Sequence, residues 1–389
     1  MTLRERIEQE IREGGPIPFS RYMELCLYEP HLGYYARHAG QFGKAGDFYT
    51  ASDVHAVFGR LLARQFEEMW RALRSPERIE ILELGPGRGL FAQDVLDRSE
   101  KKFRDFFRAL HYTLAEHSPA LRERLKDTLS RHIESGTASL ATGEGTASAV
   151  PVQLPQHVRA LAPEVPVIVF ANEFFDALPV EVISPKGTLH VDVQDGRCME
   201  TWAPASPEVL DFIEHYSVHP EAGARVEASL RAQRYMSGVA ESVQRGFIIA
   251  IDYGYTRSEQ LAGRHRGTVM TYRQHSASPN PYEAPGEQDI TAHVNFTALA
   301  AAAEQHGMQA HELLTQSRFL LGIGEQNQFA DAFEECRLPQ ERAKVALQLK
   351  HLVTPAGMGE IFHVLLASKG VDPTSVASLS GLNFGRSRL

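Results

Sequence analysis

The sequence has few of the features on which secreted, metal-binding or membrane proteins depend. Its three cysteines are odd in number and far apart, which argues against a disulfide framework or a cysteine metal site. The histidines, including His31, His275 and His293, have no second ligand at metal spacing. No run approaches the ~18 apolar residues of a membrane-spanning helix, and a net charge of −9 disfavours a nucleic-acid partner. We expect no metal, no membrane insertion and no nucleic acid.

Residues 1–13 also lack the features of a targeting peptide. They alternate Arg and Glu without the apolar core of a signal peptide, and their glutamates are unusual in a mitochondrial transit peptide. Cysteines without a pairing pattern are typical of buried thiols in a reducing compartment. The sequence therefore predicts a cytoplasmic protein.

The most informative stretch is a strand–turn–helix pattern over residues 79–96. The apolar run at 81–84 has the length of a strand, and Phe91 and Val95 begin a helical pattern. The five residues from Gly85 to Gly89 form the turn between them, and its glycines permit positive φ and close approach of a ligand. Such a turn before a helix N-terminus receives a nucleotide-like group, unless it is only a tight connection.

The spacing of this turn separates two classes of cofactor. Dinucleotide sites read G-x-G-x-x-G, whereas this chain reads acidic-x-G-x-G-x-G over Glu83, Gly85, Gly87 and Gly89. A glutamate before the first glycine repels a diphosphate but suits a cation. S-adenosylmethionine carries an ammonium and a sulfonium, so we expect this cofactor, with Glu83 on its ammonium side and the amides of Gly85 and Gly87 near its amino-acid part. A nicotinamide enzyme is disfavoured.

A second strand is predicted over residues 111–115, and it ends at Glu116-His117-Ser118. An acidic residue at the tip of the second strand holds a ribose in doubly wound folds. We therefore assign Glu116 to the ribose hydroxyls and place His117 and Ser118 beside the cofactor. The alternative is a solvated carboxylate at a strand end.

Two further buried strands end in polar residues. Asn172, Glu173 and Asp176 follow the strand at 165–170, and Asp252 lies at the tip of the strand at 246–252. Because the carboxyl ends of parallel strands meet at one edge of a sheet, these side chains should face the cofactor crevice. We predict Asn172 at the cofactor, and Glu173 and Asp176 as catalytic residues with Asp252 in reserve. The alternative is that these acids only cap a helix or bind backbone amides.

A loop at residues 40–51 places aromatic residues among glycines. This composition favours a lid over a ligand, with Asp47 and Thr50 covering the cofactor site. The alternative is a surface loop held together by its own aromatic side chains.

The order of the predicted elements indicates an α/β fold, a doubly wound and mostly parallel sheet. A hairpin over 188–202 and a polar helical stretch form an insertion between the fourth and fifth strands. Asp289 is expected to open a helix that ends at Gly307. The predicted organisation is N-terminal helices and a lid loop (1–75), a cofactor-binding core (76–370) with the insertion at about 184–245, and a flexible tail (371–389).

Several separated motifs resemble the MidA-like S-adenosylmethionine-dependent methyltransferases. The motifs span most of the chain in order: Gly46–Ala51, Glu83–Gly89, Asn172–Pro179, Ile251–Gly254, Gly267-Thr268, Tyr272-Arg273, Asp289–Val294 and Met358–Glu360. The resemblance implies methyl transfer from S-adenosylmethionine, with the glycine turn as the cofactor cradle and 172–179 near the reacting centre. Mitochondrial members of that family methylate an arginine and assist assembly of respiratory complex I.

Three functions stay open on the sequence alone. The first is arginine methylation of a partner protein, for which a respiratory-complex subunit is one candidate. The second is methylation of a small molecule or another side chain on the same scaffold, because fold does not fix substrate. The third is a non-catalytic assembly factor that retains the cofactor site. The sequence predicts no oligomeric state.

Overall fold

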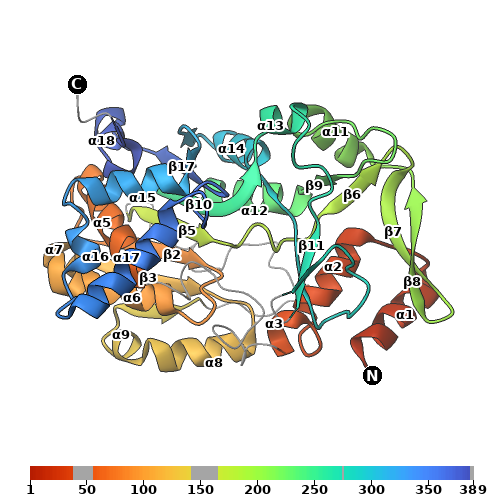
Figure 1. Ribbon diagram of the computed structural model, residues 1–389, viewed down its shortest axis with the longest axis horizontal. Coiled ribbons are helices and arrows are strands. Elements are labelled where there is room, and N and C mark those ends of the chain that lie inside the picture. The colour runs from red at the N-terminus through yellow and green to blue at the C-terminus, as the bar shows by residue number, and fades with distance from the viewer. Residues whose placement is uncertain (38–55, 142–164, 274–275, 386–389) are drawn as a thin grey trace.

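The computed structural model describes residues 1–37, 56–141, 165–273 and 276–385. Its central sheet has the strand order β15–β17–β10–β5–β2–β3–β4, and the strands from β10 to β4 are parallel (Figure 1). Strand β17 is antiparallel to β10 and carries β15 and β16 at its outer side. The bounds are β2 (Ile79–Leu84), β3 (Leu110–Ala115), β4 (Ala138–Leu140), β5 (Val167–Asn172), β10 (Gly246–Tyr255), β15 (Gln309–Ala310), β16 (Leu314–Thr315) and β17 (Phe362–Lys369).

This strand order confirms the predicted doubly wound fold. The chain runs outward from β2 through β3 to β4, then returns to β5 and continues to β10 on the other side. The direction of winding therefore reverses between β2 and β5, which is where folds of this kind bind ligands. The inner strands are mostly apolar and buried almost throughout, because helices cover both faces of the sheet.

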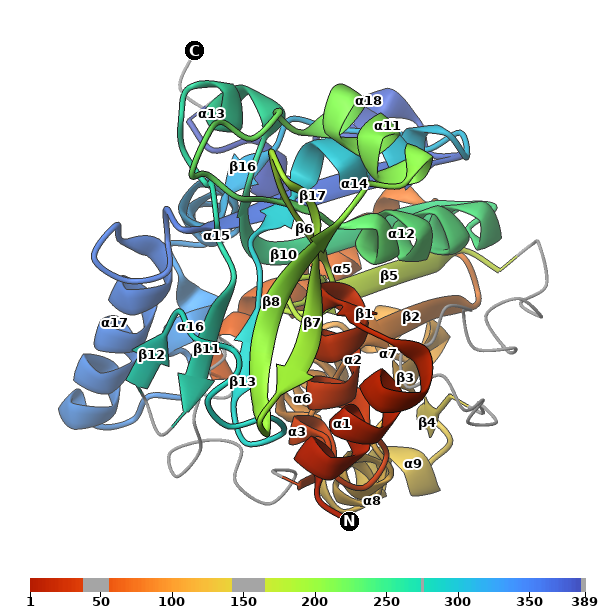
Figure 2. The same ribbon diagram turned by 90° about the vertical axis from the view of Figure 1, so that its right-hand side faces the viewer.

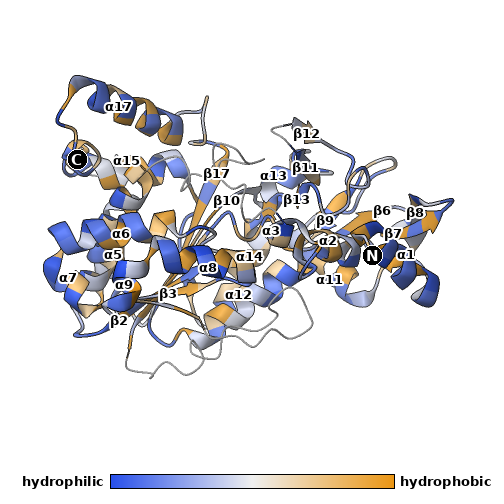
Figure 3. Ribbon diagram, turned by 90° about the horizontal axis from the view of Figure 1, so that it is seen from below, coloured by the Kyte–Doolittle hydropathy of each residue, from blue (hydrophilic) through white to orange (hydrophobic). Residues whose placement is uncertain are grey.

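Two layers of helices cover the sheet (Figure 1). One face packs against α5 (Ala56–Ala72), α6 (Leu90–Lys102) and α15 (Gln316–Glu325), through residues such as Phe66, Phe170 and Ile249. The other face packs against α12 (Leu230–Ser242) and α14 (Phe296–Glu304), through residues such as Val169 and Met236. Figure 3 shows the apolar strands in the interior and the hydrophilic faces of helices such as α6 and α7 (Arg104–Ala109) outside. In the described ranges, no helix has both the length and the apolarity needed to cross a membrane.

A second sheet joins the N-terminus to the insertion. Strand β1 (Ile17–Pro18) pairs with β7 (Gly187–Gln194), and β7 pairs with β8 (Arg197–Ala203) in the predicted hairpin. Strands β6 (Glu181–Ser184) and β9 (Val226–Ala228) complete this sheet. Helices α1 (Leu3–Gly14) and α2 (Phe19–Tyr28) share its core, and Figure 2 shows them beside β7 and β8.

The remaining short elements lie around these two sheets. A third sheet holds β11 (Met270–Arg273), β12 (Ser276–Ser278) and β13 (Asp289–Thr291). Strand β14 (Val294–Asn295) pairs in parallel with the last two residues of β10. The helices not yet named are α3 (Tyr34–Arg37), α8 (Pro119–Thr128), α9 (Ser130–Glu134), α11 (Pro207–Tyr216), α13 (Arg257–Leu261), α16 (Ala330–Phe333), α17 (Pro339–Val353), α18 (Pro373–Ala377) and η1 (Ser380–Leu382).

Two local predictions differ from the structure. Residues from Asp289 form strand β13 because they pair with β11, and the helix begins only at Phe296 after the Asn295 cap. The described part of the expected flexible tail forms α18 and η1, where amides of Ser380 and Gly381 donate to side chains of α5. The domain division itself stays a prediction.

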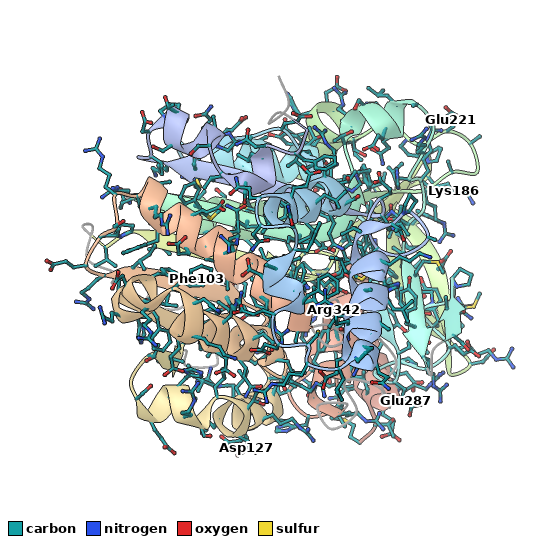
Figure 4. All side chains as sticks on the ribbon, turned by 60° about the vertical axis from the view of Figure 1, so that its left-hand side comes forward. Phe103, Asp127, Lys186, Glu221, Glu287 and Arg342 are labelled. Atoms are coloured by element: carbon teal, nitrogen blue, oxygen red, sulfur yellow. The ribbon has the colours of Figure 1, made fainter. Side chains whose placement is uncertain are left out.

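An ion-pair network fastens α16 to the sheet-covering helices. The buried Asp331 carboxylate accepts from Arg64 of α5 and Arg98 of α6, and Arg98 also pairs with Glu334 at 2.8 Å. Phe103, labelled in Figure 4 where α6 meets α7, lies under the Arg64 guanidinium with 5.5 Å between the guanidinium carbon and the ring centroid. The network therefore combines buried charges with packing.

Asp331→Ala is expected to lower the free energy of unfolding by about 3 kcal/mol, because it leaves the buried Arg98 without its main partner. Glu335→Gln is the matched control, since Glu335 forms exposed pairs with Arg60 and Lys101 and should cost less than about 1 kcal/mol. Urea denaturation of both variants checks the difference. Equal effects would show that burial of the network contributes little.

Candidate active site

The polar residues at the strand ends meet along one edge of the central sheet. Leu84 is in register with Ala115 on one side and with Ala171 on the other, and Asn172 is in register with Ile251. Gly85 and Glu116 directly follow β2 and β3, Asn172 ends β5, and Asp252 lies within β10, which continues to Tyr255. The structure brings together the residues that the sequence placed at strand tips.

The glycine turn needs its glycines for different reasons. All three have positive φ: 63° at Gly85, 55° at Gly87 and 78° at Gly89. A Cβ on Gly85 would lie 2.9 Å from the Phe174 ring, and one on Gly89 would lie 2.6 Å from Leu125 of α8. A Cβ on Gly87 would meet no heavy atom of the described residues within 4 Å. Among these residues Gly87 thus borders open space, whereas Gly85 and Gly89 allow close packing.

Two carboxylates flank this turn. Glu83 is buried at the end of β2 and accepts a hydrogen bond of 2.8 Å from the Tyr112 hydroxyl. Burial raises the pKa of Glu83 to about 8, and the charge of Glu116 adds to this effect. Burial also raises the pKa of Glu116 to about 7, although backbone amides, including that of Gly87, oppose it. Both carboxyls are therefore poised to gain stability from a nearby cation or hydroxyl donor.

The two residues after Glu116 have distinct environments. The Ser118 amide donates to Glu116 at 2.8 Å, and the Ser118 hydroxyl accepts from the Leu121 amide as the cap of α8. The same hydroxyl lies 3.2 Å from the carbonyl oxygen of Tyr35, to which it donates. Burial lowers the pKa of His117. Ser118 therefore links the edge of the sheet to helix α3, and the predicted cofactor role of both residues stays a prediction.

The loop after β5 begins with a strained residue. Glu173 has a backbone φ of +50°, which is uncommon for a residue other than glycine. Its amide donates to the Ile251 carbonyl oxygen at 2.9 Å. The Asn172 amide group donates to Glu173 at 3.1 Å, while its buried Oδ1 has no hydrogen-bond partner in the described chain. Strain of this kind is typical of functional sites.

Asp252 holds this loop through backbone amides. Its Oδ2 accepts from the amides of Phe175 and Asp176 at 3.0 and 3.2 Å, and its Oδ1 accepts from the Tyr253 amide at 2.9 Å. The side chain is fully buried, and burial together with the charges of Asp176 and Glu173 raises its pKa. This geometry agrees with the alternative in which Asp252 binds backbone amides, and its predicted catalytic role stays a prediction.

Asp176 presents a different arrangement. Its Oδ2 accepts a 2.6 Å hydrogen bond from the Tyr253 hydroxyl, and its Oδ1 is buried without a hydrogen-bond partner among the described residues. Burial raises the pKa of Asp176 to about 6, so the carboxyl is mostly ionised at neutral pH. Three acidic side chains, Glu173, Asp176 and Asp252, thus gather at one strand edge. A cation bound beside them would relieve their repulsion.

Sequence reasoning missed the tyrosines that hold these acids. Tyr112 and Tyr253 each donate to a carboxylate, yet their patterns alone indicated only strand positions. Tyr253 did lie in the motif that follows Asp252, which was the available signal. The predicted lid residues Asp47 and Thr50 lie outside the described residues.

Comparison with known proteins gives these features a context. A family model described as an S-adenosyl-L-methionine-dependent methyltransferase matches residues 61–314. The Drosophila melanogaster "Protein arginine methyltransferase NDUFAF7 homolog, mitochondrial" is 27% identical, and the alignment covers 95% of this chain and 85% of the Drosophila protein. The Mus musculus "Protein arginine methyltransferase NDUFAF7, mitochondrial" is 29% identical, and the alignment covers 91% of this chain and 81% of the mouse protein. A COG1565 superfamily structure from Burkholderia thailandensis, bound to S-adenosyl-homocysteine, has a TM-score of 0.78 at 27% identity, covering 97% of this chain and 94% of that one.

These relatives overturn the predicted cytoplasmic location. The Drosophila, mouse and human relatives are all named as mitochondrial proteins. The prediction rested on the composition of residues 1–13 and on three cysteines without a pairing pattern, and neither feature distinguishes the cytoplasm from another reducing compartment.

The residues at the sheet edge fit the cofactor of this family. Gly87 borders open space, Glu83 and Glu116 are carboxyls with raised pKa values, and Asn172 has an acceptor without a partner in the described chain. S-adenosylmethionine has an ammonium, a sulfonium and a ribose diol, which match these groups. Since the family model also matches more than half of the sequence, the chain belongs to the S-adenosyl-L-methionine-dependent methyltransferases, and S-adenosylmethionine is its cofactor.

Proposed function

We propose that this methyltransferase acts on the guanidinium group of an arginine in a partner protein. The observation that carries the proposal is the buried Asp176 carboxylate, which keeps one acceptor oxygen without a partner in the described chain and has Glu173 on the same loop. The curated relatives, named protein arginine methyltransferases, support the substrate class. A respiratory-complex subunit is the first acceptor to test.

The cofactor supplies an electrophilic methyl group on its sulfonium. We assign Glu83 and the amides of Gly85 and Gly87 to its amino-acid part, and Glu116 with its neighbours His117 and Ser118 to its ribose. Asn172 lies between these groups and the acidic loop. This chain's residues contribute mainly alignment, and holding two reactants in place can be worth on the order of 10⁵ M or more in effective molarity.

The acidic loop would orient the acceptor. A guanidinium is delocalised and a weak nucleophile, and it forms paired hydrogen bonds with carboxylates. Carboxylates of Glu173 and Asp176 would hold two of its nitrogens and draw positive charge away from the third. The Tyr253 hydroxyl fixes Asp176 Oδ2 for this role, and Asp252 fixes the backbone of the loop. The third nitrogen would then be free to face the cofactor.

Cofactor binding is expected to strengthen as the pH rises from about 5.5 to about 7.5. The pKa of Glu83 is about 8 in the free protein, so binding of the cofactor ammonium must release a proton from this carboxyl. Affinity should therefore rise by up to about tenfold per pH unit. Calorimetric titrations across this range check the slope, which should disappear in Glu83→Gln. A flat profile in the unmodified protein would place the ammonium elsewhere.

The same carboxyl has the opposite effect on folding. Its folded pKa of about 8 lies above the ordinary value of 4.5, so its contribution favours the folded state at low pH and is lost as the pH rises from 4.5 through 8. The free protein should thus lose this part of its stability over the range in which cofactor affinity rises.

Mass spectrometry of the methylated product tests the function itself. Arginine-containing proteins incubated with the enzyme should gain a methyl group on a guanidinium nitrogen. Methylation of another side chain or of a small molecule would favour the second function. Cofactor binding without any methyl transfer would favour a non-catalytic assembly factor.

A further inference from the structure

A chain of contacts runs from the acidic loop into the N-terminal helices. The Tyr28 hydroxyl, at the end of α2, donates to the Ala177 carbonyl oxygen at 2.9 Å. The Tyr28 ring lies against that of Tyr35, with 5.3 Å between centroids. The Tyr35 hydroxyl then donates to Asp289 Oδ1 at 3.2 Å. Two tyrosines therefore connect the residue after Asp176 to a carboxylate on β13.

The backbone closes this chain into a ring. The Ala292 amide donates to the Asp176 carbonyl oxygen at 2.9 Å, and β13 begins at Asp289, three residues before Ala292. Asp289 is only 7% exposed. We call the group formed by Tyr28, Tyr35, Asp176 and Asp289, which these contacts connect, the acceptor enclosure. Its residues come from α2, α3, the loop after β5 and β13.

The charges of Asp176 and Asp289 both act on the same tyrosines. Burial raises the pKa of Tyr28 and of Tyr35, and in each case the charges of Asp289 and Asp176 add to the effect. The pKa of Tyr272 is raised in the same way, by burial and then by these two charges. Tyr272 lies opposite Asp289 across the β11–β13 pair, so the two side chains share a face of that sheet.

Tyr35 also contacts the cofactor side of the site. Its carbonyl oxygen accepts from the Ser118 hydroxyl, and the Ser118 amide donates to Glu116. One residue of α3 therefore connects the predicted ribose carboxylate with Asp289. Because each link is a direct hydrogen bond, movement of α3 would alter both sides of the site together.

We propose that Asp289 is a second carboxylate that recognises the cationic side chain of the acceptor, and that Tyr35 is a positioning residue which holds it. The proposal rests on the proposed function for its substrate class. A guanidinium binds carboxylates at its edge and aromatic rings at its face. Two aspartates from different elements, with tyrosines 28, 35 and 272 beside them, provide both kinds of contact.

Direct binding of a peptide tests this proposal without relying on turnover. The probes are a short peptide with one arginine and the same peptide with citrulline, which has the same shape but no charge. The unmodified protein should bind the arginine peptide more tightly. Asp289→Asn should weaken binding of that peptide about tenfold or more, the effect expected for loss of a charged hydrogen bond, and leave citrulline binding unchanged. Tyr35→Phe should weaken arginine binding about threefold.

Glu283→Gln provides the matched control. Glu283 is exposed in the segment that precedes β13. Its substitution by glutamine removes one negative charge, as Asp289→Asn does, but arginine binding should not change. A double variant of Tyr35 and Asp289 should bind no more weakly than Asp289→Asn alone, since Tyr35 acts through Asp289. Cofactor affinity should stay within about twofold in all variants.

The outcomes separate this proposal from the proposed function. Equal affinity for arginine and citrulline, an Asp289→Asn variant that binds like the unmodified protein, or a loss of cofactor affinity in that variant would each overturn the role of Asp289. Charge-dependent binding that requires Asp289, but without any methylarginine in the product, would support Asp289 and contradict arginine methylation.

Discussion

Replacing Gly87 by valine is expected to abolish S-adenosylmethionine binding while the protein stays folded. Gly87 has φ of +55°, which a β-branched residue rarely adopts, and its Cβ would meet no atom of the described residues at the tip of the turn. The side chain would thus occupy the cradle without striking the core. Calorimetry should show at least a hundredfold loss of affinity, and circular dichroism should stay close to that of the unmodified protein.

Gly89→Val is the informative control for this experiment. A Cβ at Gly89 would lie 2.6 Å from Leu125 Cδ2, so this substitution should disturb the contact between the turn and α8. Loss of stability is therefore expected at Gly89, whereas loss of ligand is expected at Gly87. Retained cofactor affinity in Gly87→Val would show that the cradle is assigned wrongly.

The second large effect is expected at the acidic loop. Glu173→Gln combined with Asp176→Asn should lower turnover by roughly 10²–10³, because the acceptor loses both carboxylates that orient it. Cofactor affinity should change by less than about twofold, since these acids lie beyond Asn172 on the acceptor side. Rate measurements with saturating cofactor check the first value, and calorimetry checks the second.

Two further variants show whether the loss comes from chemistry or from structure. Glu241→Gln removes an exposed charge from α12 and should leave turnover unchanged. Asp252→Asn should destabilise the protein as well as slow it, because Asp252 accepts from three backbone amides. Near-normal turnover of the Glu173 and Asp176 double variant, with the cofactor bound, would rule out the carboxylate clamp.

The edge of the central sheet could be predicted from the sequence because its signals are local. A glycine turn between a strand pattern and a helix pattern specifies a nucleotide-binding connection. Parallel strands then bring their carboxyl ends together, so Glu116, Asn172 and Asp252 could be placed beside Gly85 without knowledge of any contact.

The contacts across the site could not be predicted in this way. Tyr253 reaches Asp176, and Tyr35 reaches Asp289, over 77 and 254 positions of sequence. Such pairs depend on the register of strands and on the packing of the N-terminal helices. Asp289 itself was misplaced in a helix, because an aspartate before apolar residues is also typical of a helix cap, whereas pairing with β11 makes it a strand.

The central claim is that an arginine side chain accepts the methyl group. The most direct measurement is mass spectrometry of two matched peptide pools, one with arginine and one with citrulline, after incubation with S-adenosylmethionine carrying an isotopically labelled methyl group. If the enzyme methylates arginine through the acidic loop, label is expected on guanidinium nitrogens in the arginine pool, none in the citrulline pool, and almost none when Glu173 and Asp176 are both neutralised. Label on any other group, or equal labelling by the double variant, would contradict this function.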